Sequence, residues 1–381
     1  MANKYVTVLD VGSSKISLLV GTRGVNDSIS VKCETERSYG GFFEGQFFDE
    51  NDLYTAVKSA VLEIEEKLDL PIGEVFVGVP GAFVKLVNKK YKISFLRAKR
   101  IRRKDIDCLF DGGQANIVEN GYEVIGRSPL YFVLDDSRRV DDPEGTVSSM
   151  LGGCLTYFLC ENYFVNLLGK ILEELKIKTV NFVYTGQAEG DYLLSDEERD
   201  YPSLILDVGY TTSDVSIHYG KGVLAKFSED FGGGMLAFTL MTEFELTPDE
   251  SEELKRSINF GYSSSSSLTY TVSTNDGERE ISCEEVNEKA VECVDTFVGQ
   301  VYEFLEENSK KIPDNPRVYL TGGGISFLRG VKLHLSARFG VSVEILAPSV
   351  PFFNKANKSS VFAVLDYALK KQESKKSFFK F

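Results

Sequence analysis

The chain has 381 residues, 43% of them hydrophobic, which is enough for two or more domains with substantial cores. Its formal net charge of −14 excludes DNA or RNA binding through bulk electrostatics, so we expect no nucleic-acid partner. We expect no signal peptide and no transmembrane helix. The N-terminus lacks a charged segment before an apolar core, and no apolar run approaches the roughly 20 residues of a membrane span.

The cysteines and histidines argue against several kinds of site. The six cysteines form no Cys-x-x-Cys pair and show none of the usual zinc spacings. We therefore expect reduced thiols in a cytoplasmic protein. Only His218 and His334 occur, which argues against a metal site or a catalytic triad built on histidine.

The first predicted element is a β-hairpin over residues 6–20. Its first apolar strand ends in Leu-Asp-Val-Gly at residues 9–12, and the chain returns through Ser13, Ser14 and Lys15. Backbone N–H groups of such a turn converge on an anion, hydroxyls add donors, and the carboxylate can hold a metal through water. The segment therefore predicts a hairpin that binds phosphate.

A helix and a buried strand follow the hairpin. Asp49 or Asn51 is expected to cap the helix, and Pro71 to end it. The buried strand covers residues 74–80, and the order strand, strand, helix, strand is typical of an α/β lobe. The helix itself is predicted from apolar residues at helical spacing: Leu53, Val57, Val61, Ile64 and Leu68.

Residues 84–160 differ in character and are interpreted as an α+β insertion. The basic stretch 97–104 is interpreted as a solvated loop and helix start, rather than as a lipid or nucleic-acid site. Short alternating strands are expected to surround one helix, with the strands at residues 89–95 and 121–133 and the helix near 103–116.

The α/β pattern then resumes and leads to a second hairpin at residues 204–217. This hairpin repeats Leu-Asp-Val-Gly at residues 206–209, followed by Tyr210, Thr211 and Thr212. Two copies about half a chain apart suggest two related lobes that face each other across one nucleotide. The intervening elements are expected to be a helix at 163–175, a strand at 179–184 and a helix to residue 194.

The second lobe is predicted to carry its own insertion at residues 245–310. It contains an acidic helix, a serine run at 263–267 read as a loop tip, a strand pair and a long helix over 283–308. The lobe closes with a strand at 317–321 that enters a triple-glycine turn, then a helix from about Ser326. Glycines let backbone approach a ligand closely, and a helix N-terminus favours anions.

These pieces, in this order and spacing, resemble the actin-like ATPase superfamily and, within it, FtsA, a family of bacterial cell-division proteins. The resemblance rests on residues 9–16, 44–49, 75–81, 251–255 and 362–368. It implies an α/β fold of two lobes, duplicated and ribonuclease-H-like, with an FtsA-type insertion called 1C in the first lobe. The implied subdomains are 1A at 1–83 and 161–199, 1C at 84–160, 2A at 200–244 and 311–370, 2B at 245–310, and a basic-aromatic tail at 371–381.

The same resemblance implies a site for ATP and Mg²⁺. Asp10, Asp207 and Asp214 are expected to contact the metal through water, although aspartates also cap turns. Glu252 and Lys255 fit contacts to ribose or base, with a solvated helix face as the alternative. The implied nucleotide-binding residues are Asp10, Gly12, Ser13, Ser14, Lys15, Asp207, Gly209, Thr211, Thr212, Gly233, Gly234, Glu252, Lys255, Gly322, Gly323 and Gly324.

The chain departs from the family pattern where hydrolysis is concerned. Tyr210 stands in a glycine-rich turn, where its side chain either disfavours the third phosphate or points outward. Thr185 and Gly186 occupy the places of an acidic residue and a proline. Gln187 is a candidate to orient the attacking water, against the simpler interpretation of an ordinary helix start. We therefore expect ATP hydrolysis to be slow at most.

The function that the resemblance implies is a division-site scaffold on the inner face of the membrane. Such a protein binds ATP, polymerises, captures FtsZ filaments through 245–310 and receives other division proteins through 84–160. The chain end supplies lysines and aromatic residues for an interfacial anchor on anionic lipid, with a frayed terminus as the alternative. These are Lys375, Lys376, Phe378, Phe379, Lys380 and Phe381.

Two other functions stay open at this stage. A PilM-like adaptor of the same superfamily would bind a peptide in the groove near 84–160. A small-molecule kinase would need a catalytic base that faces a second ligand pocket. The sequence offers no such carboxylate beyond those assigned to the metal.

Overall fold

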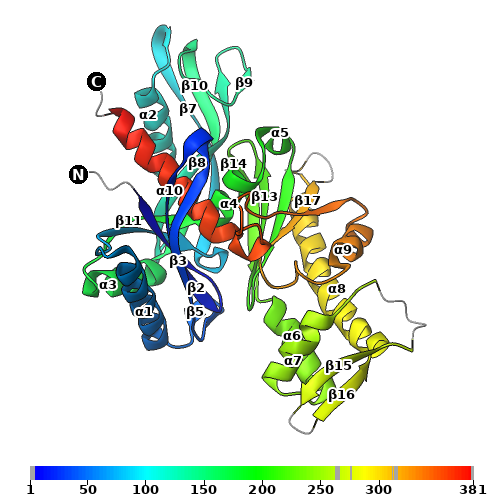
Figure 1. The fold of residues 1–381 in the computed structure, drawn as a ribbon. Helices are drawn as coiled ribbons and strands as arrows, with labels where there is room; N and C mark the ends of the chain where they lie inside the picture. The colour runs from blue at the N-terminus through cyan, green and yellow to red at the C-terminus, as the bar shows by residue number, and fades with distance from the viewer. Residues whose placement is uncertain (1–4, 262–266, 275–276, 311, 313–315, 379–381) are drawn as a thin grey trace.

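The computed structural model describes residues 5–261, 267–274, 277–310, 312 and 316–378, and it has two α/β lobes (Figure 1). The first lobe is built on a five-stranded sheet of order β11-β6-β1-β2-β3. Its strands are β1 (Val6–Val11), β2 (Lys15–Arg23), β3 (Ile29–Ser38), β6 (Glu74–Val79) and β11 (Lys178–Tyr184).

The second lobe repeats this arrangement in a sheet of order β14-β13-β12-β17-β18. In both lobes the first strand pairs antiparallel with the next and parallel with a later one. The predicted duplication of two hairpin-led lobes is therefore confirmed. The strands of the second sheet are β12 (Ser203–Val208), β13 (Ser213–Tyr219), β14 (Gly222–Glu229), β17 (Arg317–Thr321) and β18 (Val343–Ile345).

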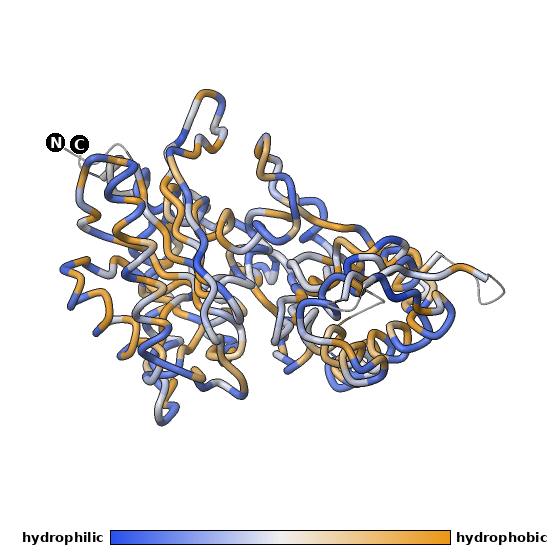
Figure 2. Tube along the Cα trace, turned by 60° about the horizontal axis from the view of Figure 1, so that its bottom comes forward, coloured by the Kyte–Doolittle hydropathy of each residue, from blue (hydrophilic) through white to orange (hydrophobic). Residues whose placement is uncertain are grey.

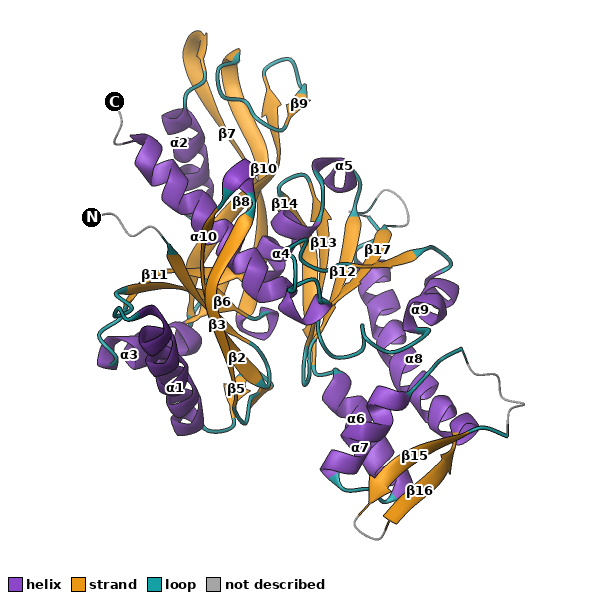
Figure 3. Cartoon of the chain, viewed as in Figure 1, coloured by secondary structure: helices purple, strands orange, loops and turns teal. Residues whose placement is uncertain are grey.

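Helices cover both faces of the first sheet, as Figure 3 shows. On one face pack α1 (Glu50–Leu68) and α3 (Asn162–Glu174). On the other pack α4 (Thr185–Leu193) and α10 (Ser359–Phe378). The N-cap of α1 is Asp49, whose carboxylate accepts from two backbone N–H groups of the first turn, so the alternative cap at Asn51 is wrong.

Helix α10 corrects one predicted boundary. Residues 311–370 are expected to belong to the second lobe, but α10 packs on β1, β2 and β6 of the first. Asp366 of α10 pairs with Arg23 of β2 at 2.7 Å, and Lys358 pairs with Glu34 at 3.0 Å. The chain therefore crosses back over the junction of the lobes after β18.

One face of the second sheet carries four helices and a strand pair. The predicted order of the insertion is confirmed, with α7 (Pro248–Ser257), β15 (Thr269–Thr274), β16 (Gly277–Ser282) and α8 (Cys283–Glu307). These pack with α6 (Gly233–Phe244) and α9 (Val331–Phe339) around one apolar core. Figure 2 shows hydrophobic and hydrophilic residues alternating along the helices of this lobe, as expected where one face is buried.

Helix α9 starts later than predicted. It begins at Val331 rather than near Ser326, because the residues after the triple glycine form turns. The Ser326 hydroxyl donates to the Gly322 carbonyl at 2.5 Å, which offers the backbone an alternative to the helix. The N-terminus of α9 therefore does not follow the glycines directly.

The first-lobe insertion forms a separate antiparallel sheet of order β7-β10-β8-β9, with α2 (Arg103–Gln114) on one face. Its strands are β7 (Val84–Arg100), β8 (Tyr122–Leu134), β9 (Arg139–Val140) and β10 (Val147–Glu161). The prediction of short strands is wrong, since β7 has 17 residues. Lys99 and Arg100 pair with β10, so the first part of the basic stretch is the end of a strand and not a loop, whereas Arg103 and Lys104 begin α2, as predicted.

The remaining elements of the described chain are short. They are the strands β4 (Phe42–Phe43) and β5 (Gln46–Phe47), the helix α5 (Asp196–Arg199), and the 3-10 helices η1 (Val25–Asp27), η2 (Gly81–Phe83) and η3 (Ala356–Lys358). In the described part of the chain, no helix is long and apolar enough to cross a membrane. Lys375, Lys376 and Phe378 continue the backbone of α10. Phe379, Lys380 and Phe381 of the predicted anchor lie outside the described residues, as does most of the serine run.

The packing in the core of the second lobe predicts how two Phe→Ala substitutions change the free energy of unfolding. Phe297 of α8 is fully buried and stacks on Phe231 at 4.5 Å between ring centroids, so Phe297→Ala should cost about 3 to 5 kcal/mol. Phe238 of α6 is 59% exposed, so Phe238→Ala should change the free energy of unfolding by less than about 0.5 kcal/mol. Urea unfolding of both variants measures this difference, and equal losses would contradict the assigned core.

Candidate nucleotide site

A cleft of about 440 Å³ opens between the two lobes. The ends of β1 and β12, the two hairpin turns, α7, the triple-glycine segment and the start of α10 all line it. Thirteen of the predicted site residues lie there: Asp10, Gly12, Ser13, Ser14, Lys15, Asp207, Gly209, Thr212, Asp214, Glu252, Lys255, Gly322 and Gly323.

The two hairpin turns have the same geometry. The N–H of Gly12 donates to the Lys15 carbonyl at 2.9 Å, and the N–H of Gly209 donates to the Thr212 carbonyl at 3.0 Å. A Cβ at Gly12 would lie 2.9 Å from the same Lys15 oxygen, and a Cβ at Gly209 would lie 2.6 Å from that of Thr212. Each turn therefore closes so tightly that only glycine fits its first position.

The turns also touch each other across the cleft. The N–H of Thr211 donates to the Ser13 hydroxyl at 3.1 Å. The Thr211 hydroxyl is placed to donate to the carbonyls of Ser13, at 3.3 Å, and Phe42, at 3.2 Å. Thr211 thus joins lobe to lobe and does not line the cleft, in contrast to its predicted role.

Because the two lobes are duplicated, Asp10 and Asp207 occupy equivalent positions near the ends of β1 and β12. In the register of β1 with β2, Asp10 lies opposite Ser17, and in that of β12 with β13, Asp207 lies opposite Asp214. Burial raises the pKa of Asp10 to about 6, while the Ser360 hydroxyl and Lys15 act in the opposite direction. Burial, with the charges of Asp214 and Asp10, raises the pKa of Asp207 to about 7.

Asp207 fits a role as a ligand of metal-bound water. Among the described residues its carboxylate has no hydrogen-bond or ion-pair partner, and its negative neighbours are Asp214 and Asp10. A divalent cation would relieve this repulsion. In the same part of the chain, no three Asp, Glu, His or Cys side chains lie close enough to hold a metal ion. The arrangement therefore suits Mg²⁺ held through water rather than by direct ligation.

Asp214 differs from the other two aspartates because it already has partners. It accepts from the Tyr184 hydroxyl at 2.5 Å and from the Ser228 hydroxyl at 2.9 Å. Buried Lys226 lies 3.4 Å away, and burial lowers the pKa of this lysine, against the effect of Asp214. The structure therefore gives Asp214 a buried ion pair in addition to its position in the cleft.

One wall of the cleft is built on Lys255 of α7. Lys255 is only 3% exposed, so the alternative of a solvated helix face is wrong for this residue. Its ammonium group lies 2.7 Å from Glu252, donates to the Gly233 carbonyl at 3.0 Å and lies 5.1 Å from the centroid of the Tyr210 ring. The Tyr210 hydroxyl donates to Glu252 at 3.0 Å, so this tyrosine forms part of the wall instead of pointing away.

Three predicted glycines lie behind the cleft rather than in it. The N–H groups of Gly233 and Gly234 donate to the carbonyls of Gly209 and Tyr210, at 3.0 and 2.7 Å. Gly324 donates to Val208 at 2.7 Å. Gly233, Gly234 and Gly324 therefore support the second hairpin turn from behind. Lining residues that the sequence analysis missed include Arg256, Phe327, Asn357 and Ser360.

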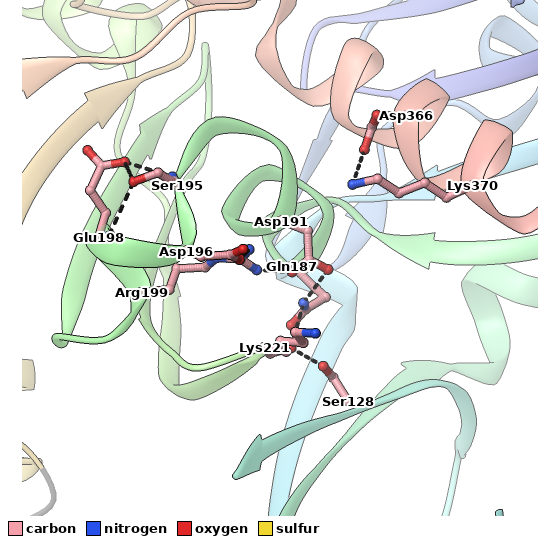
Figure 4. Close-up of polar contacts among 10 residues, drawn as sticks. All are labelled: Ser128, Gln187, Asp191, Ser195, Asp196, Glu198, Arg199, Lys221, Asp366 and Lys370. Atoms are coloured by element: carbon pink, nitrogen blue, oxygen red, sulfur yellow. Dashed lines mark hydrogen bonds and ion pairs between the residues drawn. The ribbon is translucent and has the colours of Figure 1, made fainter. Parts of the chain in front are cut away.

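Gln187 does not reach the cleft. Its amide nitrogen donates to the Asp191 carboxylate at 2.7 Å and to the Lys221 carbonyl at 3.2 Å. Figure 4 marks both contacts with dashed lines. The Ser128 hydroxyl of the insertion donates to that same carbonyl. Gln187 thus ties the first lobe to the second, and its predicted role in orienting water has no support in this geometry.

Glu189 is an acidic residue of the site that sequence reasoning missed. It lies one turn after Thr185 on α4 and is 1% exposed, and among the described residues one of its carboxyl oxygens has no partner. Burial, then Asp207, Asp214 and Asp10, raises its pKa well above the ordinary value. Glu189 is therefore a buried acid that interacts electrostatically with the three cleft aspartates and whose charged form is disfavoured.

Comparisons with known proteins agree with the resemblance. The model of the SHS2 domain inserted in FtsA matches residues 81–156. FtsA of Neisseria meningitidis is 21% identical over 261 residues, which are 68% of this chain and 62% of that protein, so the match spans about three fifths of its length. FtsA of Streptococcus pneumoniae is 22% identical over 350 residues, which are 91% of this chain and 76% of that protein.

Solved structures share the fold over nearly the whole chain. A PilM–PilN type IV pilus biogenesis complex matches with a TM-score of 0.67 and 16% identity, covering 96% of this chain and 98% of the other. MreB5 of Spiroplasma citri bound to AMPPNP matches with a TM-score of 0.57 and 12% identity, covering 99% of each chain. The predicted actin-like fold and the resemblance to FtsA are therefore confirmed.

The raised pKa of Asp207 predicts how the substitution Asp207→Asn changes the free energy of unfolding as the pH rises. Asp207→Asn should raise the free energy of unfolding, and this gain should be larger at pH 8 than at pH 5 by about 1 to 3 kcal/mol. The reason is that a carboxyl with a folded-state pKa near 7 is protonated in the fold at pH 5 and charged at pH 8, where its charge destabilises the fold. Chemical denaturation at both pH values measures the effect.

Asp214→Asn is the matched control for that measurement. It removes a carboxylate from the same hairpin but leaves buried Lys226 without its partner, so it should destabilise the fold at pH 8. If Asp207→Asn lowers stability at pH 8 as much as Asp214→Asn does, the assignment of Asp207 as an unpaired buried acid is wrong.

Proposed function

We propose that this FtsA-like chain is a cell-division protein of the actin-like family that binds ATP with Mg²⁺, polymerises and tethers FtsZ filaments to the membrane. The observation that carries the proposal is the pair of equivalent hairpin turns that meet at one cleft. Similarity to FtsA over 350 residues supports the cellular role, and the insertion at 81–156 supports the choice among actin-like proteins.

The cleft has the parts that a nucleotide requires. Its volume of about 440 Å³ is within the range of about 300 to 1,000 Å³ for small-molecule sites. The N–H groups and hydroxyls of Ser13, Ser14 and Thr212 suit phosphates, and Lys15 supplies a cation. Glu252 and Lys255 on the opposite wall suit the ribose and base. Bound Mg²⁺ would screen the phosphate charges from Asp10 and Asp207.

Closure of the lobes is the proposed switch. Phosphates that bridge both turns would favour the closed arrangement, in which Thr211 already bonds to Ser13. Contacts between protomers would then depend on the nucleotide. We propose that hydrolysis is slow at most, because Gln187 is engaged behind the cleft.

The proposed partners occupy different parts of the chain. FtsZ would bind the subdomain at 245–310, other division proteins would bind the insertion at 84–160, and copies of the chain would bind one another. The tail, including Lys375 and Lys376, would hold anionic lipid on the inner face of the membrane at the division site. A tail that binds the membrane weakly would be sufficient to attach a polymer, because many copies bind at the same time.

One alternative function has an observation in its favour. The PilM–PilN complex shares the fold with a TM-score of 0.67, so an adaptor that binds a peptide stays a second candidate. The kinase alternative has no such support. The carboxylates that line the cleft are Asp10, Asp207, Asp214 and Glu252. Asp10 and Asp207 are assigned to the proposed metal through water, and Asp214 is held by Tyr184, Ser228 and Lys226. Glu252 pairs with Lys255, so none of the four is free to serve as a base beside a second substrate.

A reconstitution with FtsZ and anionic liposomes tests the tether. The full chain should carry FtsZ filaments into the liposome pellet, and a chain ending at Ser374 should bind filaments but leave them in the supernatant. The expected reason is the loss of lysines that each contribute about 1 kcal/mol of attraction to an anionic surface. Sedimentation with and without each component measures the distribution.

The same assay has two outcomes that contradict the proposal. Equal recovery of FtsZ with both chains would remove the tail as the anchor. No recovery with the full chain, when the chain alone pellets with liposomes, would remove FtsZ as the partner.

A further inference from the structure

The insertion and the second lobe enclose a groove that the nucleotide cleft does not use. Two hollows, of about 680 and 550 Å³, share Lys90 and Tyr131 and therefore lie side by side. The groove runs along the face of the insertion sheet opposite α2 and reaches the second lobe at Leu224. Figure 1 shows α2 on the other side of β7.

The strand register explains why this face is open. Lys92, Gly152 and Val133 lie opposite one another on β7, β10 and β8, and so do Lys90, Cys154 and Tyr131. Directly paired residues point to the same face of a sheet. The residues between them, such as Phe132, point to the core against α2. Because Gly152 has no side chain, the floor of the groove is the backbone of the central strand.

The charged side chains that line the groove are positive in the part of the chain that the structure describes. They are Lys90, Lys92, Arg139 and Lys310, and none of the described lining residues carries a carboxylate. Among the described residues, none of these four forms an ion pair. Some other cations of the insertion do form ion pairs, such as Lys85 with Glu119 at 2.9 Å and Lys99 with Asp105 at 2.7 Å. In a chain with a net charge of −14, four unpaired cations around one groove form an anion-binding surface.

Apolar side chains lie between these charges. Tyr131, Val133 and Met150 are half-buried, and the guanidinium of Arg139 lies 4.3 Å from the centroid of the Tyr131 ring. Four strands span about 14 Å at a spacing of about 4.8 Å. The groove therefore offers both apolar contacts and positive charge over the length of a few extended residues.

We propose that this groove binds an acidic peptide segment that carries apolar anchor residues and belongs to a partner protein. The side walls favour a peptide over a lipid surface, because Tyr219 and Leu224 of the second lobe rise beside the sheet and leave a channel rather than a flat face. This inference extends the proposal that residues 84–160 recruit other division proteins. It depends on that proposal only for the cellular role of the partner. Binding itself requires neither nucleotide nor FtsZ.

Fluorescence anisotropy with labelled eight-residue peptides tests the inference on the full chain. A peptide of four Glu, two Leu and two Ser should bind, whereas one with Lys in place of Glu and one with Ser in place of Leu should bind at least about tenfold more weakly. Lys90→Glu combined with Lys92→Glu should weaken the first peptide by at least about tenfold, and added salt should weaken it further.

The matched control is Lys104→Glu, which reverses an exposed charge on α2, on the opposite face of the insertion. It should leave the affinity unchanged, and circular dichroism should show that all variants are folded. Equal binding of the acidic and basic peptides would overturn the proposal. So would equal binding to the double variant and to the wild type.

A second readout uses the thiols of the chain itself. Cys154 lies in the groove and is half-buried, whereas Cys108 is exposed on α2. The acidic peptide should slow alkylation of Cys154 but not of Cys108, as resolved by mass spectrometry. Loss of protection at Cys154 would overturn the proposal, as would displacement of the peptide by vesicles of anionic phospholipid. Because this test uses no nucleotide and no FtsZ, its failure is distinct from failure of the proposed tether.

Discussion

The contact between two glycine turns, one from each lobe, is the constraint on which the rest of this structure depends. Each turn closes on its own first glycine, and the Thr211 N–H of one turn donates to the Ser13 hydroxyl of the other. This contact holds Asp10 and Asp207 on the two sides of one cleft. The charge of Asp10 adds to burial and Asp214 in raising the pKa of Asp207, so a divalent cation bound beside these carboxylates would relieve their repulsion.

Other elements act by keeping that contact in place. Helix α10 crosses from the second lobe to the first, and its Ser360 hydroxyl donates to Asp10. Helix α4 lies between the two sheets, and Gln187 on it shares the Lys221 carbonyl with Ser128 of the insertion. A movement of one lobe relative to the other would therefore shift residues of the insertion, where the proposed peptide groove lies. These hydrogen bonds form a contiguous path from α4 through Lys221 to the insertion.

Sequence reasoning succeeded where local pattern and duplication decide the structure. The repeated Leu-Asp-Val-Gly placed both hairpins, and the spacing of apolar residues from Leu53 to Leu68 placed α1, although the helix ends at Leu68 rather than at Pro71. It failed where tertiary contacts decide. The start of α9 depends on a serine hydroxyl that bonds to Gly322, the length of β7 depends on pairing with β10, and the position of α10 depends on the first sheet. Glu189 carries no local signal at all, because its role comes from neighbours distant in sequence.

Titration calorimetry of the full chain with ATP and Mg²⁺ tests the central claim most directly, with Gly209→Ala and Gly73→Ala as the paired variants. The wild type should release or absorb heat with a one-to-one stoichiometry. Gly73→Ala should match it, because an added Cβ at Gly73 meets nothing within 4 Å. Gly209→Ala should lose at least about tenfold in affinity, because its Cβ would displace the turn that faces the phosphates. No heat with the wild type, or equal binding by both variants, would contradict the account.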